Sequence, residues 1–158
     1  NFEARGEIFA ASSFGCCGLL SLGRSPSPWP CHGIEHEVSA WYDITHGVGL
    51  AIITPHWMQW CLDTDPALVA PKFAQYGVNV FGLNPADGVE VNAKKAIEKT
   101  AAFFRSIGIT QTLKDFGIDD SHIEAMAEHV TTAWVGDYKY AFVPMDKEAV
   151  LAVLRASL

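Results

Sequence analysis

The chain has 158 residues, a length that corresponds to one domain with a substantial hydrophobic core. Hydrophobic residues make up 49% of it and charged residues only 18%, which excludes an intrinsically disordered chain. The net charge of −7 argues against nucleic-acid binding, because proteins of that class normally present a basic face. Because about 25% charged residues is usual, the low fraction of charged residues also indicates that part of the apolar surface contacts a partner.

The N-terminal region is predicted to be helical. Apolar and small residues recur at helical spacing over residues 3–22, and Gly23 ends the run. The uncharged stretch over residues 8–23 is shorter than the ~20 residues that span a bilayer, and no basic segment precedes it as in a signal peptide. The adjacent Cys16 and Cys17, with no C-x-x-C pair among four cysteines, indicate a reducing, cytoplasmic setting.

Helical signals also dominate the rest of the chain. Three prolines within residues 23–30 predict a loop. Beyond it, apolar periodicity and the positions of glycine, proline and aspartate predict helices over residues 31–41, 46–62, 66–76, 89–107, 119–135 and 146–156. We therefore expect an all-α fold, a bundle of about seven helices with at most two short strands.

The pattern also predicts local features of three segments. The helix over residues 46–62 is apolar on all sides, which predicts full burial, and Pro55 predicts a kink or a break within it. Residues 77–82 alternate briefly between apolar and polar character, but the segment is too short for a sheet. Asp119 is the expected N-cap of the helix that ends before Gly136, with Trp134 facing inward.

Three of the six histidines, His32, His36 and His46, fall within fifteen residues. His32 and His36 are four residues apart and share one helix face. His46 opens the next predicted helix, and the intervening turn can fold it back to within about 6 Å of His32, with His36 on the same side. Neutral imidazoles suit zinc, iron, cobalt or nickel, so the cluster predicts a metal site. The alternative is a set of histidines with purely structural contacts.

Two other interpretations remain open at this point. His32, Glu35 and His36 form an H-x-x-E-H string, the signature of inverted zincins, in which the histidines bind zinc and the glutamate is the general base. A third ligand would then come from a distant carboxylate, Glu98, Glu124 or Glu128. The second interpretation is a non-catalytic all-α module with vestigial histidines.

The remaining polar and aromatic residues near the cluster are expected to have ordinary roles. Glu35 and Glu37 are candidates either for supporting the site from behind its ligands or for the surface, and a solvated face is the favoured interpretation. The tryptophans are predicted to be core or pocket-lining residues: Trp41, Trp57 and Trp60. The other histidines are predicted to be structural: His56, His122 and His129.

The run HGIEHEVSAWYDITHGVGLAIITPHWM, from His32 to Met58, strongly resembles the iron-containing alcohol dehydrogenase family, and within it the NAD(P)H-dependent butanol dehydrogenases. The H-x3-H-x9-H-G spacing is specific. Further similar segments extend the resemblance over nearly the whole chain, at residues 3–5, 18–24, 73–74, 79–82 and 103–108. The loop over residues 23–30 departs from the family's pattern in being longer and rich in proline.

The resemblance implies the C-terminal helical domain of the dehydroquinate synthase-like fold, without its N-terminal α/β domain. In such proteins one Asp and three His hold a divalent metal, usually iron and sometimes zinc. The last two of these histidines match His32 and His46, while His36 matches a histidine near the nicotinamide and substrate. The other two ligands and the Gly-rich turn for the dinucleotide would lie upstream of Asn1. Residues 1–158 are therefore interpreted as one all-helical metal-binding domain, truncated on its N-terminal side.

The activity that this resemblance implies is hydride transfer between NAD(P)H and a short-chain alcohol or aldehyde, such as butanol or butyraldehyde. The metal would polarise the carbonyl oxygen, and His36 would orient substrate or cofactor or relay a proton. The implied partners are the N-terminal dinucleotide-binding domain, the small substrate and further copies in a homo-oligomer, with no nucleic acid or membrane. The chain by itself is expected to be inactive, to bind metal weakly and to self-associate through exposed apolar surface.

Overall fold

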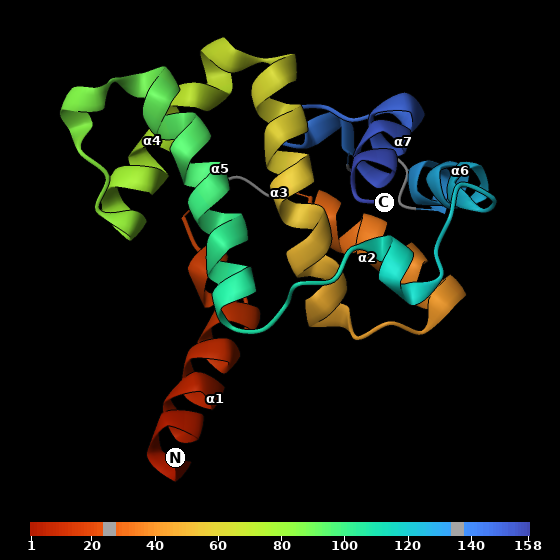
Figure 1. Ribbon diagram of the computed structural model, residues 1–158, viewed down its shortest axis with the longest axis horizontal. Helices are drawn as coiled ribbons and strands as arrows, with labels where there is room; N and C mark the ends of the chain where they lie inside the picture. Colours follow the sequence, from red (N-terminus) through yellow and green to blue (C-terminus); the bar gives the residue numbers. More distant parts are fainter. Residues whose placement is uncertain (24–27, 134–137) are drawn as a thin grey trace.

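The computed structural model describes residues 1–23, 28–133 and 138–158, and its described residues form helices with no β-strand. These described segments contain seven α-helices (Figure 1): α1 (Phe2–Cys16), α2 (Pro30–Tyr42), α3 (His46–Thr64), α4 (Pro66–Phe81), α5 (Val89–Ser106), α6 (Ile123–Ala133) and α7 (Lys147–Ala156). Short 3-10 turns lie between them: η1 (Leu19–Ser21), η2 (Pro85–Asp87), η3 (Leu113–Phe116) and η4 (Tyr138–Tyr140). The expected all-α class is confirmed.

The helix α3 stands between the other two parts of the bundle (Figure 1). On one side α4 and α5 pack against it and against each other, around a core that includes Met58, Phe73 and Ile97. On the other side α2, α6 and α7 enclose a second core that includes Ile34 and Val150. Each large aliphatic side chain buried in this way contributes about 1.5–3 kcal/mol. Packing in the two cores therefore fixes the position of α3, including its first residues.

Most of α3 is buried or half-buried, which agrees in part with its apolar sequence. From Val48 to Leu62 only Gln59 is exposed, while His46 and Gly47 at the start are exposed as well, so the predicted full burial of this helix is wrong. The helix continues through Pro55, and the predicted break does not occur.

Two predicted helix boundaries are wrong for identifiable reasons. The alternating residues 77–82 belong to the end of α4, which stops at Gly82 in the left-handed conformation (φ 67°). This end of α4 packs closely on α5, since a Cβ on Gly77 would lie 3.1 Å from the Cβ of Ala96. The helix expected from residue 119 begins at Ile123, because the carboxylate of Asp119 accepts the Ser121 N–H (2.9 Å) in a local turn that competes with the helix. The predictions for Trp134, Val135 and Gly136 lie outside the described residues.

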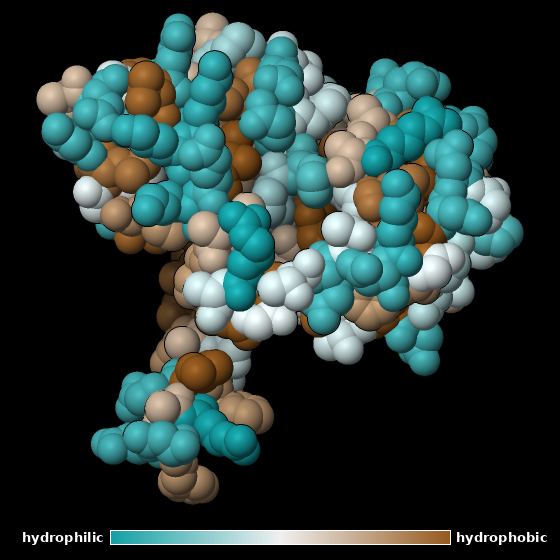
Figure 2. Space-filling model, in the orientation of Figure 1, coloured by the Kyte–Doolittle hydropathy of each residue, from teal (hydrophilic) through white to brown (hydrophobic). Residues whose placement is uncertain are grey.

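The first helix differs from the rest in having no buried residue, although all of its residues are described. The predicted helix over residues 3–22 stops at Cys16, and Gly18 (φ 80°) turns the chain into η1. Figures 1 and 2 show α1 projecting away from the bundle. Its apolar side chains are exposed, including Phe2 (94%) and Phe9 (76%). An isolated helix of this length is only marginally stable in water, so α1 has a surface that would gain from a partner.

Within the described part of the chain, no helix combines the length and the apolar character needed to cross a bilayer.

Candidate metal centre

The turn between α2 and α3 brings the three predicted site histidines together. Asp43 adopts the left-handed conformation (φ 51°) at the end of α2 and reverses the chain, so that His46 begins α3 beside the face of α2 that carries His32 and His36. The ring centroids lie 5.3 Å apart for His32 and His46, 5.2 Å for His36 and His46, and 6.2 Å for His32 and His36.

The three imidazoles differ in their surroundings. His36 and His46 are exposed, while His32 is half-buried and meets the edge of the Trp29 indole at a centroid distance of 4.6 Å. Burial lowers the pKa of His32, the nearby His46 and His36 lower it further, and Glu35 acts in the opposite direction. The net effect favours the neutral imidazole, which is the form that binds a metal.

Glu35 and Glu37 are both buried, so the prediction of a solvated face is wrong. One oxygen of Glu35 contacts His46 Nδ1 and the other accepts a hydrogen bond from Ser39 Oγ. Glu37 contacts His129 Nδ1 on α6 at 2.6 Å. Each buried carboxylate thus has a polar partner, as buried charges require. The two histidine partners come from other helices, so the α2 sequence alone does not identify them.

The tryptophan predictions are partly right. Trp57 and Trp60 are half-buried and pack against both cores. Trp41, however, is 47% exposed and stacks on the ring of His122 at 4.5 Å. His122 and His129 have the ordinary contacts expected of structural histidines, and His56 is half-buried on α3.

Among the described residues, one group has ligand atoms close enough to share a metal ion: those of Glu35, His36 and His46 lie within 4.8 Å of one another. This set contains His46 but not His32, which the family resemblance pairs with it. The oxygens of Glu35 already accept contacts from Ser39 and His46, and its side chain has no exposed surface. Burial raises the pKa of the neighbouring Cys31 thiol to about 12, so at neutral pH Cys31 presents a thiol and no thiolate ligand.

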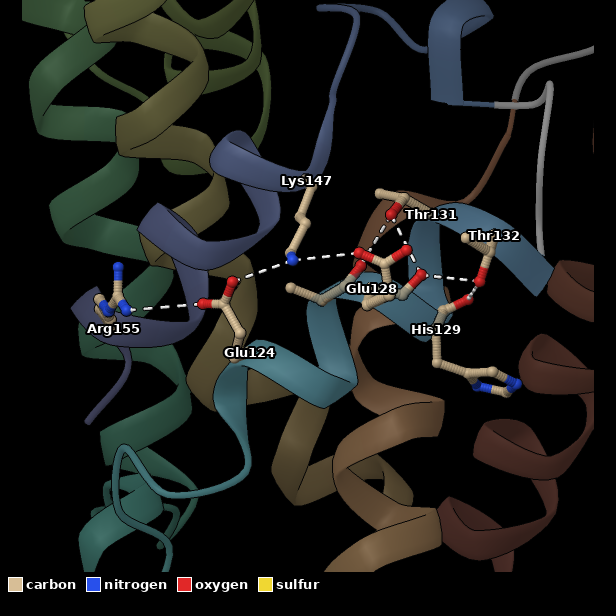
Figure 3. Close-up of polar contacts among 8 residues, drawn as sticks. Glu124, Glu128, His129, Thr131, Thr132, Lys147 and Arg155 are labelled. Carbon is tan, nitrogen blue, oxygen red and sulfur yellow. Dashed lines mark hydrogen bonds and ion pairs between the residues drawn. The ribbon is translucent and has the colours of Figure 1, made fainter.

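None of the three carboxylates that an inverted zincin could use joins His32 and His36 in a group of possible metal ligands among the described residues. Glu124 and Glu128 lie on α6, where each meets Lys147 of α7 at 2.9 and 3.0 Å (Figure 3). These ion pairs raise the pKa of Lys147 and join the two helices at their surface. Glu98 is exposed on α5. Glu35, the expected general base, is enclosed between α2 and α3. The H-x-x-E-H string therefore does not form a zincin site.

Comparison with known proteins points to one family. Residues 1–158 match the sequence profile of the Fe-containing alcohol dehydrogenase family, C-terminal. NADH-dependent butanol dehydrogenase A of Clostridium acetobutylicum is 42% identical over 158 residues, 99% of this chain and 39% of that protein. Probable NADH-dependent butanol dehydrogenase 1 of Bacillus subtilis is 36% identical over 160 residues, 100% of this chain and 39% of that protein.

The fold comparison agrees with the sequence comparison. The crystal structure of NADH-dependent butanol dehydrogenase A from Thermotoga maritima matches 99% of this chain and 39% of that chain, with a TM-score of 0.85 and 29% identity. The chain thus spans about two fifths of the length of the relatives it matches. The protein belongs to the Fe-containing alcohol dehydrogenase family, and its described residues have the all-helical fold of that family's C-terminal part.

Proposed function

We propose that this chain forms the metal-binding part of an NAD(P)H-dependent alcohol dehydrogenase or aldehyde reductase that acts on short-chain substrates such as butanol and butyraldehyde. The observation that carries the proposal is the convergence of His32, His36 and His46 where α2 meets α3. The family match and the names of the relatives, NADH-dependent butanol dehydrogenases, support the substrate and the cofactor. A dinucleotide-binding α/β domain is the proposed source of the nicotinamide site.

The proposed ligands of the metal are His32 and His46, with iron favoured by the family and zinc as the second choice. Two imidazoles that bind one ion at about 2 Å place their ring centroids about 5 Å apart, and the observed 5.3 Å fits this arrangement. The lowered pKa of His32 supports it, because the neutral ring is the ligating form. When bound, a divalent metal supplies Lewis-acid polarisation of a substrate carbonyl oxygen.

His36 is proposed to orient the substrate or the nicotinamide. Its ring is exposed and lies beside those of His32 and His46. An imidazole has one nitrogen that donates and one that accepts a hydrogen bond, so His36 is suited to contact a substrate oxygen. Trp29 lies against one side of the His32 ring in an edge-to-face arrangement.

We also propose what the chain associates with and where it is located. Exposed apolar residues of α1 support association with further protein, either the dinucleotide-binding domain or other copies in a homo-oligomer. The four cysteines are unpaired, which supports a reducing cytoplasmic location. We interpret residues 1–158 as one metal-binding domain with no dehydrogenase activity of its own.

The test is a chimera that joins this chain to the N-terminal part of the Clostridium acetobutylicum relative. With added iron or zinc, we expect the chimera to oxidise NADH in the presence of butyraldehyde, and the 158-residue chain alone to show no turnover. His46→Ala should abolish the activity of the chimera. Turnover by the isolated chain, or undiminished activity of the His46→Ala chimera, would contradict the proposal.

The metal ligands are tested separately by titrating the 158-residue chain with zinc. We expect His32→Ala to weaken binding strongly and His36→Ala to weaken it little. The reverse order would assign the metal to Glu35, His36 and His46 instead.

A further inference from the structure

Glu35 is a fully buried carboxylate directly behind His46. Its relative exposure is 0%, and its two oxygens are divided between two partners, Ser39 Oγ and His46 Nδ1. His46 itself has a side chain that is 47% exposed, and its ring lies beside the rings of His32 and His36. The imidazole of His46 thus joins a buried carboxylate on one side to the proposed metal site on the other.

The surrounding helices are shaped to hold this carboxylate in place. Gly49, one turn along α3 from His46, has no side chain where Glu35 lies: a Cβ there would come within 2.6 Å of Glu35 Oε1 and 2.7 Å of its Cγ. The same Cβ would lie 3.0 Å from Ile44 Cδ1, so the space is closed on a second side. Ser39, which contacts Glu35, also has its Oγ 3.1 Å from the carbonyl oxygen of Ile44.

This contact dictates which nitrogen of His46 carries the proton. An ionised carboxylate only accepts hydrogen bonds, and a neutral imidazole has one N–H. With Nδ1–H directed at Glu35, Nε2 keeps its lone pair free for a metal. Histidines that bind metals almost always donate their other ring N–H to a carboxylate, carbonyl or water, which sets the tautomer and the ring orientation.

We propose that Glu35 is a positioning residue of the metal centre: it holds His46 as the Nδ1–H tautomer and presents Nε2 to the ion. The inference rests on the proposed role of His46 as a metal ligand. It places Glu35 at Nδ1, on the side of the imidazole ring away from the ion. Its alternative role is direct binding of the ion together with His36 and His46, whose ligand atoms lie within 4.8 Å of one another.

The chain contains a matched control on the same helix. Glu37 is also buried and also contacts the Nδ1 atom of a histidine, His129 of α6. His129, however, belongs to no group of possible metal ligands among the described residues. A change at Glu37 therefore removes a buried carboxylate–histidine contact from α2 without touching His46.

The experiment uses the metal-free 158-residue chain labelled with ¹⁵N-histidine, observed by NMR at mildly alkaline pH, where ordinary histidines are neutral. We expect His46 to carry its proton on Nδ1. In Glu35→Gln, whose amide can present an N–H to Nδ1, and in Glu35→Leu, which has no polar group, we expect that preference to be lost. Glu37→Gln should leave the His46 signals unchanged. A wild-type His46 that carries its proton on Nε2 would overturn the proposal, whether or not the chain binds a metal.

The second readout is the affinity for zinc alone, by calorimetry, and the visible spectrum with cobalt alone. We expect Glu35→Gln and Glu35→Leu to bind zinc about 10–100-fold more weakly than wild type, the usual effect of losing such a partner, and Glu37→Gln to bind equally well. An affinity of Glu35→Gln within twofold of wild type would overturn the proposal. A cobalt spectrum that loses one ligand in Glu35→Gln would also overturn it, in favour of direct binding. If the wild-type chain takes up no metal, the proposed metal function fails, while the NMR result still decides the tautomer.

Discussion

Helix α2 carries two buried carboxylates, Glu35 and Glu37, and each meets the Nδ1 atom of a histidine from another helix. The Glu35 contact ends at His46, whose ring lies beside two further imidazoles. The Glu37 contact ends at His129, a largely exposed residue that links α2 to α6. The two pairs have the same chemistry, so the pairing alone does not make a metal site. The two pairs differ in what lies beyond the histidine: two further imidazoles lie beside the ring of His46.

The largest expected effect is a loss of zinc affinity, and we expect it on removing the histidine of the Glu35 pair but not on removing the histidine of the Glu37 pair. His46→Ala should weaken zinc binding by the 158-residue chain on the order of 100-fold or more, because few protein ligands remain to hold the ion. His129→Ala should bind zinc like wild type. Isothermal titration of both variants measures the difference, and equal losses would remove the distinction between the two pairs.

The next largest expected effect is a loss of stability when the space around the Glu35 side chain is filled. Gly49→Ala should destabilise the chain by about 1–3 kcal/mol, because the new methyl group would overlap both the Glu35 side chain and Ile44 in a closed space. Gly47→Ala is the control on the same helix, since a Cβ there meets no atom within 4 Å. Urea unfolding monitored by circular dichroism measures both. A Gly49→Ala protein as stable as the Gly47→Ala protein would show that Glu35 is held loosely.

The Glu37 pair is expected to matter for stability alone. His129→Ala leaves the buried carboxylate of Glu37 without its partner, which should lower the free energy of unfolding by about 1 kcal/mol. The double variant Glu37→Gln with His129→Ala should recover part of this loss, because the uncharged amide is easier to bury. Urea unfolding of the two variants decides the matter, and no loss in His129→Ala would mean that water replaces the imidazole.

The smallest effect concerns pH. Burial lowers the pKa of His56, so the unfolded chain binds this proton more readily than the folded one. Stability should therefore fall as the pH drops from about 6.5 toward the lowered pKa of His56. His32, whose pKa is also lowered by burial, should contribute in the same direction. His56→Gln should flatten part of this slope below about pH 6.5, and an unchanged slope would show that His56 is not responsible.

The fold was largely predictable from residue pattern, because helix ends are marked locally. The helices observed as α2, α5 and α7 begin and end within a residue or two of the predicted ranges, close to glycine, proline or aspartate. The errors occur where other forces override the local pattern. Packing of Gly77 against Ala96 keeps the end of α4 helical, and the Asp119–Ser121 contact delays the start of α6.

The candidate site was predictable only in part. Spacing along α2 and a short turn suffice to bring His32, His36 and His46 together. The burial of Glu35 and Glu37 could not be read from α2, because a charged residue there normally faces water. Their burial depends on partners supplied from elsewhere, among them His129, which lies 92 residues after Glu37 in the chain. The small residue Gly49 was the one local sign that α3 leaves room for another group.

The most direct test of the account is to locate the ion itself. Crystals of the 158-residue chain soaked with zinc and measured at the zinc absorption edge would give an anomalous signal at the metal position. We predict one ion within about 2.0–2.1 Å of a nitrogen of His32 and of Nε2 of His46, with Glu35 hydrogen-bonded to Nδ1 on the other side of the His46 ring. An ion bound by Glu35 and His36, or no ion beside His46, would contradict it.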